Sequence, residues 1–517
     1  MVGSGFGGSV SALRLAEKGY RVLLLEKGRA LKEPDFPRTN WDLRRWLWMP
    51  VLGFRGPFRM TFFRHITVLS GVGVGGGSLV YANTLATPDD EFFHAPSWAK
   101  LADWGTELRP HYATVRRMLG AISTPMLTTP DRVLREIAEE DGHPEAFSPT
   151  QVGVYFGEAG RTVPDPYFNG KGPERTGCIQ CGGCMLGCRF GAKNSLDRNY
   201  LHLARAHGLE ILAETEVDFV GAREGGGYRV ETRTGFSRFG KKRRVFTSRG
   251  VVISAGVLGT LSLLHSMKRR PDGLPKLSDR LGTSVRTNSE AIIGVISRRR
   301  EDLSRGITIG SIMTFGPGGH VEPVRYSAGA GFFRVLMAPH VEGTSTIGRI
   351  LQMIAFVLTR PVEWIRAMLV PDLSRYTMML MAMRSDGATL RFMPGSFRGL
   401  STELEGDRRP AASLPEASAI ARRVAQKIDG TPVSILSETL LNVPTTAHLL
   451  GGCCMGDSAE NGVIDHRHRA FGYDELYVID GSSISADPGV NPALTISSLA
   501  ERAMSFIPSK KKTLPLA

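Results

Sequence analysis

The sequence contains few cysteines and no long apolar run. Six cysteines in 517 residues cannot form the dense disulfide framework of a small secreted protein, and such usage is typical of a reducing compartment. No apolar stretch reaches the ~18 residues of a membrane-spanning helix. The first residues also lack the charged start and apolar core of a secretory signal peptide. We therefore expect a cytoplasmic protein that folds around apolar cores without disulfides.

Acidic residues are in deficit as well. The chain has 64 lysines and arginines against 50 aspartates and glutamates, which gives a net charge of +14. The basic runs are scattered and not interleaved with aromatic residues, so nucleic acid is not an expected partner. Peripheral contact with an anionic membrane surface is the other interpretation of this charge. The composition is that of a globular protein, and the length favours roughly two or three domains.

Residues 3–8 match the G-x-G-x-x-G pattern of a dinucleotide-binding turn. The residues that form it are Gly3, Gly5, Phe6, Gly7 and Gly8, with Ser4 between the first two glycines. A helix is expected from about Ser9 to Lys18, and a buried parallel strand over residues 20–25. Glu26 follows that strand, where an acid accepts a hydrogen bond from the ribose of a dinucleotide. The pattern therefore predicts a Rossmann-like site in an α/β fold.

One part of that fold is missing from the sequence. The dinucleotide turn normally follows the central strand of its sheet, and here only Met1 and Val2 precede it. The absence of that strand would expose two strand edges. We therefore expect the first Rossmann strand to be missing from this N-terminus, and the true start to lie upstream.

Three further segments identify a family. They are GVGVGGGSLVYAN (71–83), HLLGGCCMG (448–456) and ELYVIDGSSISADPGVNPALTISSLAERAM (475–504). With the N-terminal turn, they make the chain similar, nearly end to end, to the glucose–methanol–choline (GMC) oxidoreductases, and most similar to their bacterial cholesterol oxidase branch. The resemblance implies a Rossmann-like FAD-binding domain (1–90, 190–300 and 440–517). It also implies a discontinuous substrate-binding domain (91–189 and 301–439) built on a mostly antiparallel sheet and including the cysteines of residues 178–188.

The resemblance also implies which residues contact FAD. Besides those of the N-terminal turn, they lie in a second glycine-rich loop, on two apolar strands and in the C-terminal block. They are Gly75, Gly76, Gly77, Ser78, Asn83, Val217, Gly256, Asp480, Gly481 and Pro492. Glycine suits this role because backbone without a side chain can lie directly against a flavin or its phosphates.

His448 and Asn491 are the predicted catalytic pair. Oxidation of an alcohol by a flavin requires removal of the hydroxyl proton while a hydride moves to the flavin. His448 stands where the family keeps its catalytic histidine, a residue type whose unperturbed pKa lies near operating pH. Asn491 stands where the family keeps a group that hydrogen-bonds the substrate oxygen. The cholesterol oxidase branch has a glutamate linked to double-bond isomerisation where this chain has Leu373–Arg375, so oxidation is better supported than isomerisation.

Residues 301–439 contain no nucleotide motif. Tyr376–Met383 and Ala388–Phe392 are expected to pair as a β-hairpin, and their methionines suit either an adaptable apolar pocket or an ordinary core. Ile347–Leu369 is apolar with spaced arginines, and Pro361 should divide it into two helices. These helices are interpreted either as a lid over the pocket or as an interfacial pair that takes a lipid-like substrate from a membrane.

Four of the six cysteines lie close together: Cys178, Cys181, Cys184 and Cys188. Their C-x2-C-x2-C-x3-C spacing matches the ligand run of bacterial ferredoxins and favours an iron–sulfur cluster. A zinc site and a group of unliganded thiols are the alternatives. Some sugar dehydrogenases of the same superfamily hold a three-iron cluster at an equivalent place. That resemblance implies that electrons pass from the flavin to a quinone or a redox protein.

The sequence therefore predicts an FAD-dependent oxidoreductase. It would oxidise the CH–OH group of a bulky apolar alcohol, sterol-like or long-chain, by hydride transfer to the flavin, and would use an acceptor other than oxygen. One alternative is an oxidase of the cholesterol oxidase type, which uses oxygen and releases hydrogen peroxide. Another is a non-catalytic electron-transfer flavoprotein, against which the presence of His448 and Asn491 argues.

Overall fold

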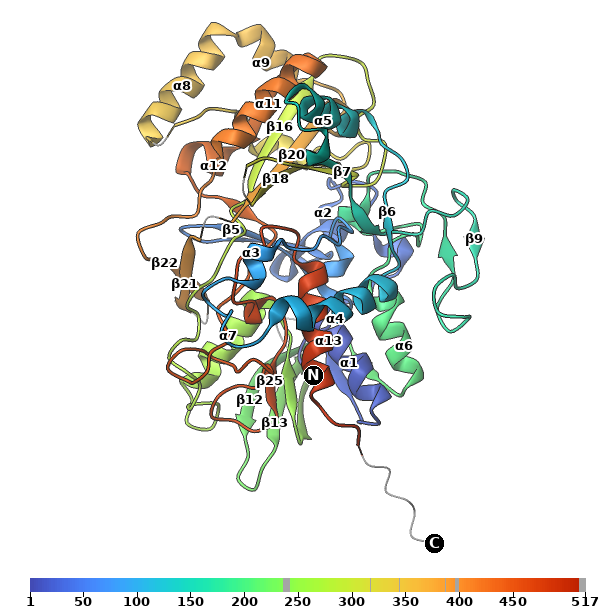
Figure 1. Ribbon diagram of the computed structural model, residues 1–517, viewed down its shortest axis with the longest axis vertical. Coiled ribbons are helices and arrows are strands. Elements are labelled where there is room, and N and C mark those ends of the chain that lie inside the picture. The colour runs from blue at the N-terminus through green and yellow to red at the C-terminus, as the bar shows by residue number, and fades with distance from the viewer. Residues whose placement is uncertain (236–241, 317, 344, 386, 396–398, 511–517) are drawn as a thin grey trace.

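The computed structural model describes residues 1–235, 242–316, 318–343, 345–385, 387–395 and 399–510. Helices and strands are mixed throughout, and the N-terminus lies in the lower part of the view in Figure 1. The α-helices are α1 (Phe6–Glu17), α2 (Leu43–Trp46), α3 (Asp90–Phe93), α4 (Trp104–Met118), α5 (Thr129–Glu140), α6 (Tyr200–Ala206), α7 (Gly256–Lys268), α8 (Thr346–Thr359), α9 (Pro361–Met368), α10 (Leu373–Tyr376), α11 (Pro415–Ile428), α12 (Leu436–Leu441) and α13 (Ala493–Ser505). The predicted mixed α/β class is confirmed.

The lower part contains a parallel sheet with a very short central segment. Its strands are β1 (Leu23–Leu25), β11 (Glu210–Leu212), β15 (Val251–Ile253) and β25 (Leu476–Val478). Val2 forms parallel bridges with both Leu25 and Ile253 and so joins the two halves of the sheet. Its N–H donates to the Val252 carbonyl at 2.9 Å, and its own carbonyl accepts from the Ser254 N–H at 2.7 Å. At the position of the central strand, a single residue thus pairs on both sides.

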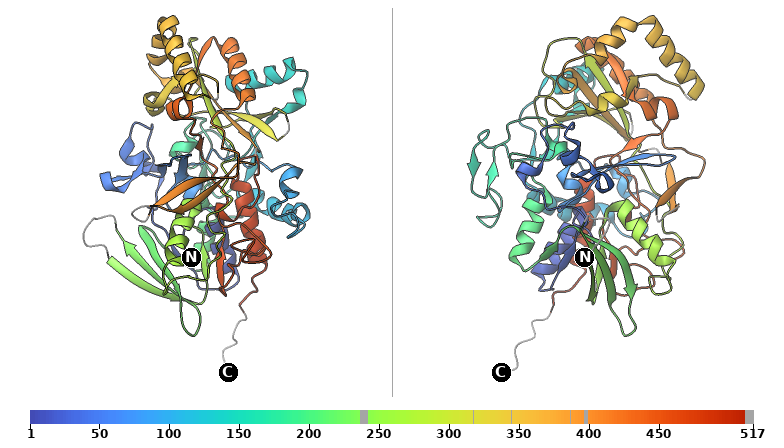
Figure 2. Two further views of the ribbon diagram at one scale, coloured as in Figure 1. Left: turned by 90° about the vertical axis from the view of Figure 1, so that its left-hand side faces the viewer. Right: turned by 180° about the vertical axis from the view of Figure 1, so that it is seen from behind.

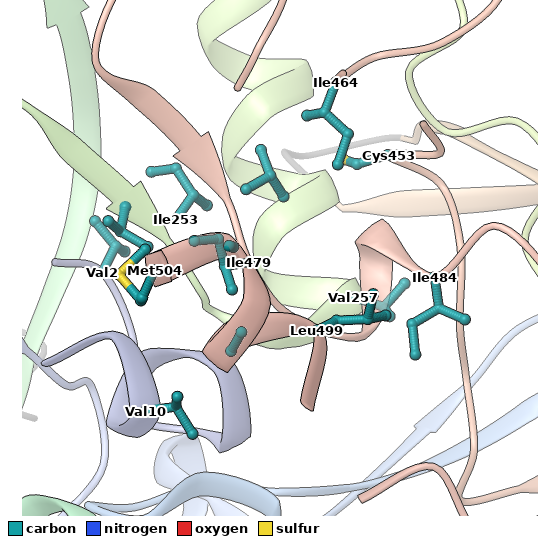
Figure 3. Close-up of a cluster of buried hydrophobic side chains, with 14 of the residues drawn as sticks. Val2, Val10, Ile253, Val257, Cys453, Ile464, Ile479, Ile484, Leu499 and Met504 are labelled. Atoms are coloured by element: carbon teal, nitrogen blue, oxygen red, sulfur yellow. The ribbon is translucent and has the colours of Figure 1, made fainter. Parts of the chain in front are cut away.

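Helices pack against this sheet through a tight apolar core. α1 lies against α6 and α13, and α13 also lies against α4. Figure 3 shows the core between them, in which Val10 and Ile253 are 0% exposed. The close approach depends on Gly7, because a Cβ added there would lie 1.8 Å from the Ile479 carbonyl oxygen. This explains why the turn needs glycine at a position that does not face a ligand.

Smaller sheets complete the lower and middle parts. β12 (Thr215–Ala222), β13 (Tyr228–Thr234) and β14 (Lys242–Ser248) form an antiparallel sheet. β5 (Thr67–Gly71) pairs with β4 (Phe58–Phe62) and β24 (Thr445–Thr446). The two-stranded pairs are β2 (Trp48–Met49) with β3 (Phe54–Arg55), β6 (Ala121–Ser123) with β8 (Gln151–Gly153), and β9 (Thr162–Val163) with β10 (Arg175–Thr176).

The upper part is built on a seven-stranded antiparallel sheet with the order β19-β23-β16-β20-β18-β17-β7. Its strands are β7 (Phe147–Pro149), β16 (Ala291–Ser297), β17 (Ser311–Thr314), β18 (Gly319–Val324), β19 (Met337–Pro339), β20 (Thr377–Arg384) and β23 (Gly430–Ile435). Alternate residues of β20 face opposite sides. Met378 and Leu380 belong to the core that includes α5 and α11 residues, whereas Met379 and Met381 line cavities on the other side. The methionines therefore serve both a core and a pocket.

The β-hairpin predicted from Tyr376–Met383 and Ala388–Phe392 is wrong. β20 pairs with β16 and β18, whereas β21 (Thr389–Pro394) pairs with β22 (Leu400–Glu405). A short polar connection containing glycine is a local signal, and here β20 finds partners on both edges from distant parts of the chain. The predicted break at Pro361 is confirmed, because α8 ends at Thr359 and α9 begins with the proline. No helix in the described residues is both long enough and apolar enough to cross a membrane. The predicted domain boundaries stay a prediction.

Candidate active site

A large cavity lies between the parallel sheet and the seven-stranded sheet. It encloses about 1680 Å³ of empty space, its open mouth included. Most of the residues predicted to bind FAD, and both predicted catalytic residues, lie on its walls. They are Gly3, Gly5, Phe6, Glu26, Gly76, Gly77, Gly256, His448, Asp480, Gly481, Asn491 and Pro492. Side chains of Val324, Tyr326 and Met381 contribute an apolar wall from the side of the seven-stranded sheet.

Glu26 is fixed at the end of β1 by the turn that precedes α1. Its Oε2 accepts hydrogen bonds from the Ser4 N–H at 3.1 Å and from the Ser4 hydroxyl at 2.7 Å. Its Oε1 accepts from the Gly28 N–H at 2.8 Å. The carboxylate is thus held rigidly on the cavity wall, as required of an acid that accepts hydrogen bonds from a ribose.

The start of α1 leaves room for a phosphate group. A Cβ added at Gly5 would meet no atom within 4 Å, although Gly5 lines the cavity directly before the first turn of the helix. Free backbone N–H groups at a helix N-terminus bind anions. Two buried polar atoms on the wall, Asn491 Oδ1 and Thr84 Oγ1, have no hydrogen-bond partner within the described part of the chain. These features fit FAD, which the residues named above would hold.

Asp480 joins two elements at the base of the cavity. Its Oδ2 accepts from the Gly256 N–H at 3.0 Å and from the Thr260 hydroxyl at 2.6 Å. Its Oδ1 accepts from the N–H and the hydroxyl of Ser482 at 2.8 and 2.6 Å. Burial raises the pKa of Asp480 above its ordinary value, although these hydrogen bonds oppose the shift. The carboxyl group therefore ties the start of α7 to the end of β25.

His448 is held by a buried carboxylate, Glu290. The ring Nδ1 lies 2.8 Å from Glu290 Oε1, and the two side chains are 12% and 1% exposed. The same carboxylate accepts from the N–H groups of Ala447 and His448, each at 3.0 Å. Burial disfavours the charged ring, but the charge and hydrogen bond of Glu290, together with the charges of Glu322 and Asp487, outweigh it and raise the pKa of His448 above its ordinary value. Because Nδ1 faces Glu290, Nε2 is the ring nitrogen left for a substrate hydroxyl.

Asn491 is oriented by a second buried carboxylate, Glu322. The Asn491 Nδ2 group donates to Glu322 Oε2 at 3.3 Å, and the exposed fractions are 5% for Asn491 and 0% for Glu322. An amide NH2 group has two hydrogens, so one remains for a substrate oxygen. Asn288 adds a further link, because its Nδ2 lies 3.4 Å from His448 Nδ1 and 3.1 Å from the Val490 carbonyl oxygen.

Six residues predicted to contact FAD do not line the cavity: Gly7, Gly8, Gly75, Ser78, Asn83 and Val217. Gly7 and Gly8 are packing positions, since a Cβ on either would overlap backbone oxygen. Ser78 Oγ donates to the Gly75 carbonyl and accepts from the Leu196 N–H, so it closes the loop. Val217 lies on β12, beside an irregularity in its pairing with β13. Asn83 is 0% exposed, and neither polar atom of its side chain has a partner among the described residues.

Sequence analysis did not single out the residues that orient the predicted catalytic pair. Glu290, Glu322 and Asn288 belong to no motif that we identified. The available signal was weak: Glu290 directly precedes the apolar strand β16, and Glu322 lies inside β18 between apolar neighbours. An acid within such a run must be paired when it is buried, but the sequence does not name its partner.

The four clustered cysteines line one smaller cavity together with Lys193. Burial raises the pKa of Cys178 to about 12 and that of Cys181 to about 11, so both are thiols at neutral pH. Met185 of the same loop lines the main cavity. Within the described ranges, however, no group of three or more His, Cys, Asp or Glu side chains is placed to hold a metal ion. The structure therefore gives the predicted iron–sulfur cluster no geometric support.

Known proteins resemble this chain along almost its whole length. Two family models described as GMC oxidoreductase match residues 173–267 and 382–500, and a model described as an NAD(P)-binding Rossmann-like domain matches residues 1–31. A cholesterol oxidase of Acinetobacter baumannii is 41% identical, over 99% of this chain and 94% of that protein. A cholesterol oxidase of Mycobacterium tuberculosis is 43% identical, over 99% of this chain and 91% of that protein.

The fold is shared with a solved structure. The crystal structure of pyridoxine 4-oxidase from Mesorbium loti superposes with a TM-score of 0.62 at 15% identity and covers 98% of this chain and 97% of that chain. At this identity the likeness shows the fold alone. The sequence matches show the family. The chain belongs to the GMC oxidoreductases, near their cholesterol oxidase branch, and is an FAD-dependent alcohol oxidoreductase.

Proposed function

We propose that the enzyme oxidises the hydroxyl group of a sterol-like alcohol to a ketone. The observation that carries the proposal is the pairing of His448 with Glu290 on the wall of a cavity whose other side is apolar. Val324, Tyr326 and Met381 suit a bulky hydrocarbon body, and the two relatives described above are named cholesterol oxidases. A long-chain alcohol is the second candidate substrate, because the same apolar wall fits an alkyl chain.

Bound FAD supplies the hydride acceptor. His448 Nε2 takes the hydroxyl proton while the carbinol hydrogen leaves as a hydride, so that the C–H and O–H bonds become a carbonyl double bond. Glu290 stabilises the positive charge that the ring gains and keeps the Nδ1 hydrogen in place. Asn491, held by Glu322, donates to the substrate oxygen and fixes its distance from His448. Around them, the buried walls keep water away from the reacting carbon.

The test is steady-state oxidation by flavin-loaded enzyme. We expect the largest kcat/KM with detergent-dispersed cholesterol, a lower value with a long-chain primary alcohol, and little with a short one. Product identification should give the ketone without double-bond migration, since the isomerisation residue of the family pattern is replaced by Leu373–Arg375. Equal kcat/KM for cholesterol and for a short alcohol would contradict a sterol-shaped pocket.

We also propose that the electrons taken from the alcohol pass to an acceptor other than oxygen. Support comes from the position of the cysteine loop, whose Met185 reaches the main cavity. The alternative is an oxidase that releases hydrogen peroxide. Parallel assays in air and with an artificial quinone under argon separate the two. Faster turnover with oxygen than with any quinone would favour the oxidase.

An iron–sulfur cluster on Cys178, Cys181, Cys184 and Cys188 remains a proposal on donor chemistry, because four free thiols share one cavity. The protein, purified anaerobically, should contain iron and acid-labile sulfide in equal amounts. Cys181→Ser should lose both, whereas Cys454→Ser, a matched change outside the loop, should keep them. Absence of iron and sulfide from the wild type would leave four ordinary thiols, and zinc without sulfide would indicate a structural metal.

A further inference from the structure

Two helices at the top of the molecule expose a long apolar face. α8 exposes Ile347, Leu351, Ile354 and Leu358 by 72, 60, 45 and 73%. α9 and its C-cap residue add Val362, Ile365 and Leu369, exposed by 59, 53 and 73%. We call these seven side chains the hairpin face. Their spacing of three or four residues puts them on one side of each helix, and contiguous exposed apolar side chains mark an interaction site.

The inner side of α8 is largely apolar as well, apart from the buried Arg349, whose guanidinium donates to the Gly343 carbonyl at 2.9 Å. Met353, Phe356 and Val357 are half-buried, and the helix lies against α12, β19 and α9. A water-exposed helix normally has a polar side opposite its buried one. α8 instead has apolar residues on both sides and is covered on one. Figures 1 and 2 place α8 and α9 at the periphery of the molecule, where the outer side is accessible.

The charged side chains around the hairpin face are mostly basic. Arg360 and Arg366 are exposed. The only acid of residues 346–369 is Glu363, which accepts from the Thr431 hydroxyl at 2.9 Å and lies 3.9 Å from Arg360. Its side chain is 22% exposed. An apolar surface flanked by two exposed arginines and one partly exposed acid complements a bilayer with anionic headgroups, whereas a second copy of this chain would bring the same cations together.

We propose that the hairpin face docks the enzyme onto an anionic lipid bilayer, with α8 and α9 lying in the plane of the interface. Seven apolar side chains would enter the boundary between headgroups and acyl chains, and Arg360 and Arg366 would meet the headgroups. α8 is too short to span a bilayer, so the contact is peripheral. The protein's net charge of +14 acts in the same direction.

Apolar side chains continue from the hairpin to the active-site cavity. Trp364 and Ala367 of α9 pack in one cluster with Met337 and Leu373. Met337 and Leu373 line a small cavity that shares Val324 and Tyr326 with the main one. Docking would therefore bring a membrane-dissolved substrate to this side of the molecule. That consequence rests on the proposed function, whereas the docking itself does not.

The experiment is flotation of the flavin-loaded, full-length protein with vesicles. The vesicles are phosphatidylcholine alone, or phosphatidylcholine with phosphatidylserine as the minority lipid. The test variant is Leu351→Gln with Leu358→Gln, and a second variant is Arg360→Gln with Arg366→Gln. The matched control is Val245→Gln, because Val245 is 60% exposed on β14, at the other end of the molecule. Flavin content and turnover on detergent-dispersed cholesterol show that each variant is folded.

We expect the wild type and Val245→Gln to float with phosphatidylserine vesicles. The leucine variant should lose about tenfold in bound fraction, and the arginine variant should lose the preference for phosphatidylserine. Vesicle binding by the leucine variant equal to wild type, or no binding by the wild type, would overturn the proposal. A wild-type dimer that the leucine changes convert to a monomer would also overturn it, since a second copy would then cover the face. Vesicle binding without turnover on cholesterol would leave the docking intact and refute only the proposed substrate.

Discussion

Replacing Glu290 by glutamine removes the charge beside His448 and keeps the shape. In the wild type, Glu290 Oε1 faces the Thr446 hydroxyl at 2.6 Å, the His448 N–H at 3.0 Å and His448 Nδ1 at 2.8 Å. Oε2 faces the Ala447 N–H at 3.0 Å. A glutamine satisfies three donors if its oxygen takes the Oε1 position, and this orientation also keeps the Nδ1 hydrogen on the ring.

The remaining donor, the Ala447 N–H, sets the size of the stability loss in Glu290→Gln. The glutamine NH2 group would then face the Ala447 N–H, so that two donors oppose each other in a buried site. One unsatisfied buried polar group costs about 1–3 kcal/mol, and we expect the free energy of unfolding to fall by about that amount. The loss should be larger at about pH 5.5 than at about pH 9. In the wild type, the pKa of His448 is higher in the folded protein than in the unfolded chain. This difference stabilises the fold at pH values below the unfolded pKa, and the contribution is lost as pH rises through the folded pKa.

The pH dependence of kcat/KM tests the catalytic role of the same pair. A general base must be unprotonated, so activity should rise with pH through the pKa of His448. Glu290 raises that pKa; its neutralisation should therefore move the acid limb of the profile to lower pH. At high pH, where the ring is neutral in both proteins, the variant should remain far more active than His448→Ala. An acid limb at the same pH as in the wild type, or higher, would refute the reasoning.

Four other substitutions test separate parts of the site. His448→Ala should retain flavin and lose about 10²–10⁴-fold in turnover, because a general base is gone; a loss below threefold would show that the ring is structural. Gly7→Ala should lower the free energy of unfolding by at least ~1–3 kcal/mol, since its Cβ would lie 1.8 Å from the Ile479 oxygen. Gly5→Ala, by contrast, should leave the stability of the apoprotein unchanged and weaken FAD binding in a titration. Asp480→Ala should lower stability by several kcal/mol, because four donors lose their acceptor and each of the three buried ones costs about 1–3 kcal/mol; wild-type stability in a denaturant titration would contradict that role.

Sequence reasoning succeeded where a local pattern carries its own chemistry. The glycine turn, the acid after the first strand, and the histidine and asparagine motifs all led to residues on one cavity wall, such as Glu26, His448 and Asn491. The turn at Pro361 was also local, because proline cannot continue α8. In each case the residue type alone restricts what the backbone or the side chain can do.

It failed where the outcome depends on contacts between distant segments. β20 was expected to pair with its neighbour in sequence, but two strands from elsewhere occupy its edges. Glu290 and Glu322 were not singled out, since their partners lie more than a hundred residues away. The cysteine spacing predicted a ligand set, but spacing alone does not fix the directions in which four side chains point.

The most direct test of the central claim is a single turnover under argon. Flavin-loaded wild-type enzyme is mixed rapidly with detergent-dispersed cholesterol, the visible flavin band is followed, and the product is quantified. We expect that the band bleaches, that one ketone forms per flavin, and that deuterium on the carbinol carbon slows the bleaching. No bleaching with cholesterol or any other alcohol, in a protein that holds FAD and is folded, would contradict the claim.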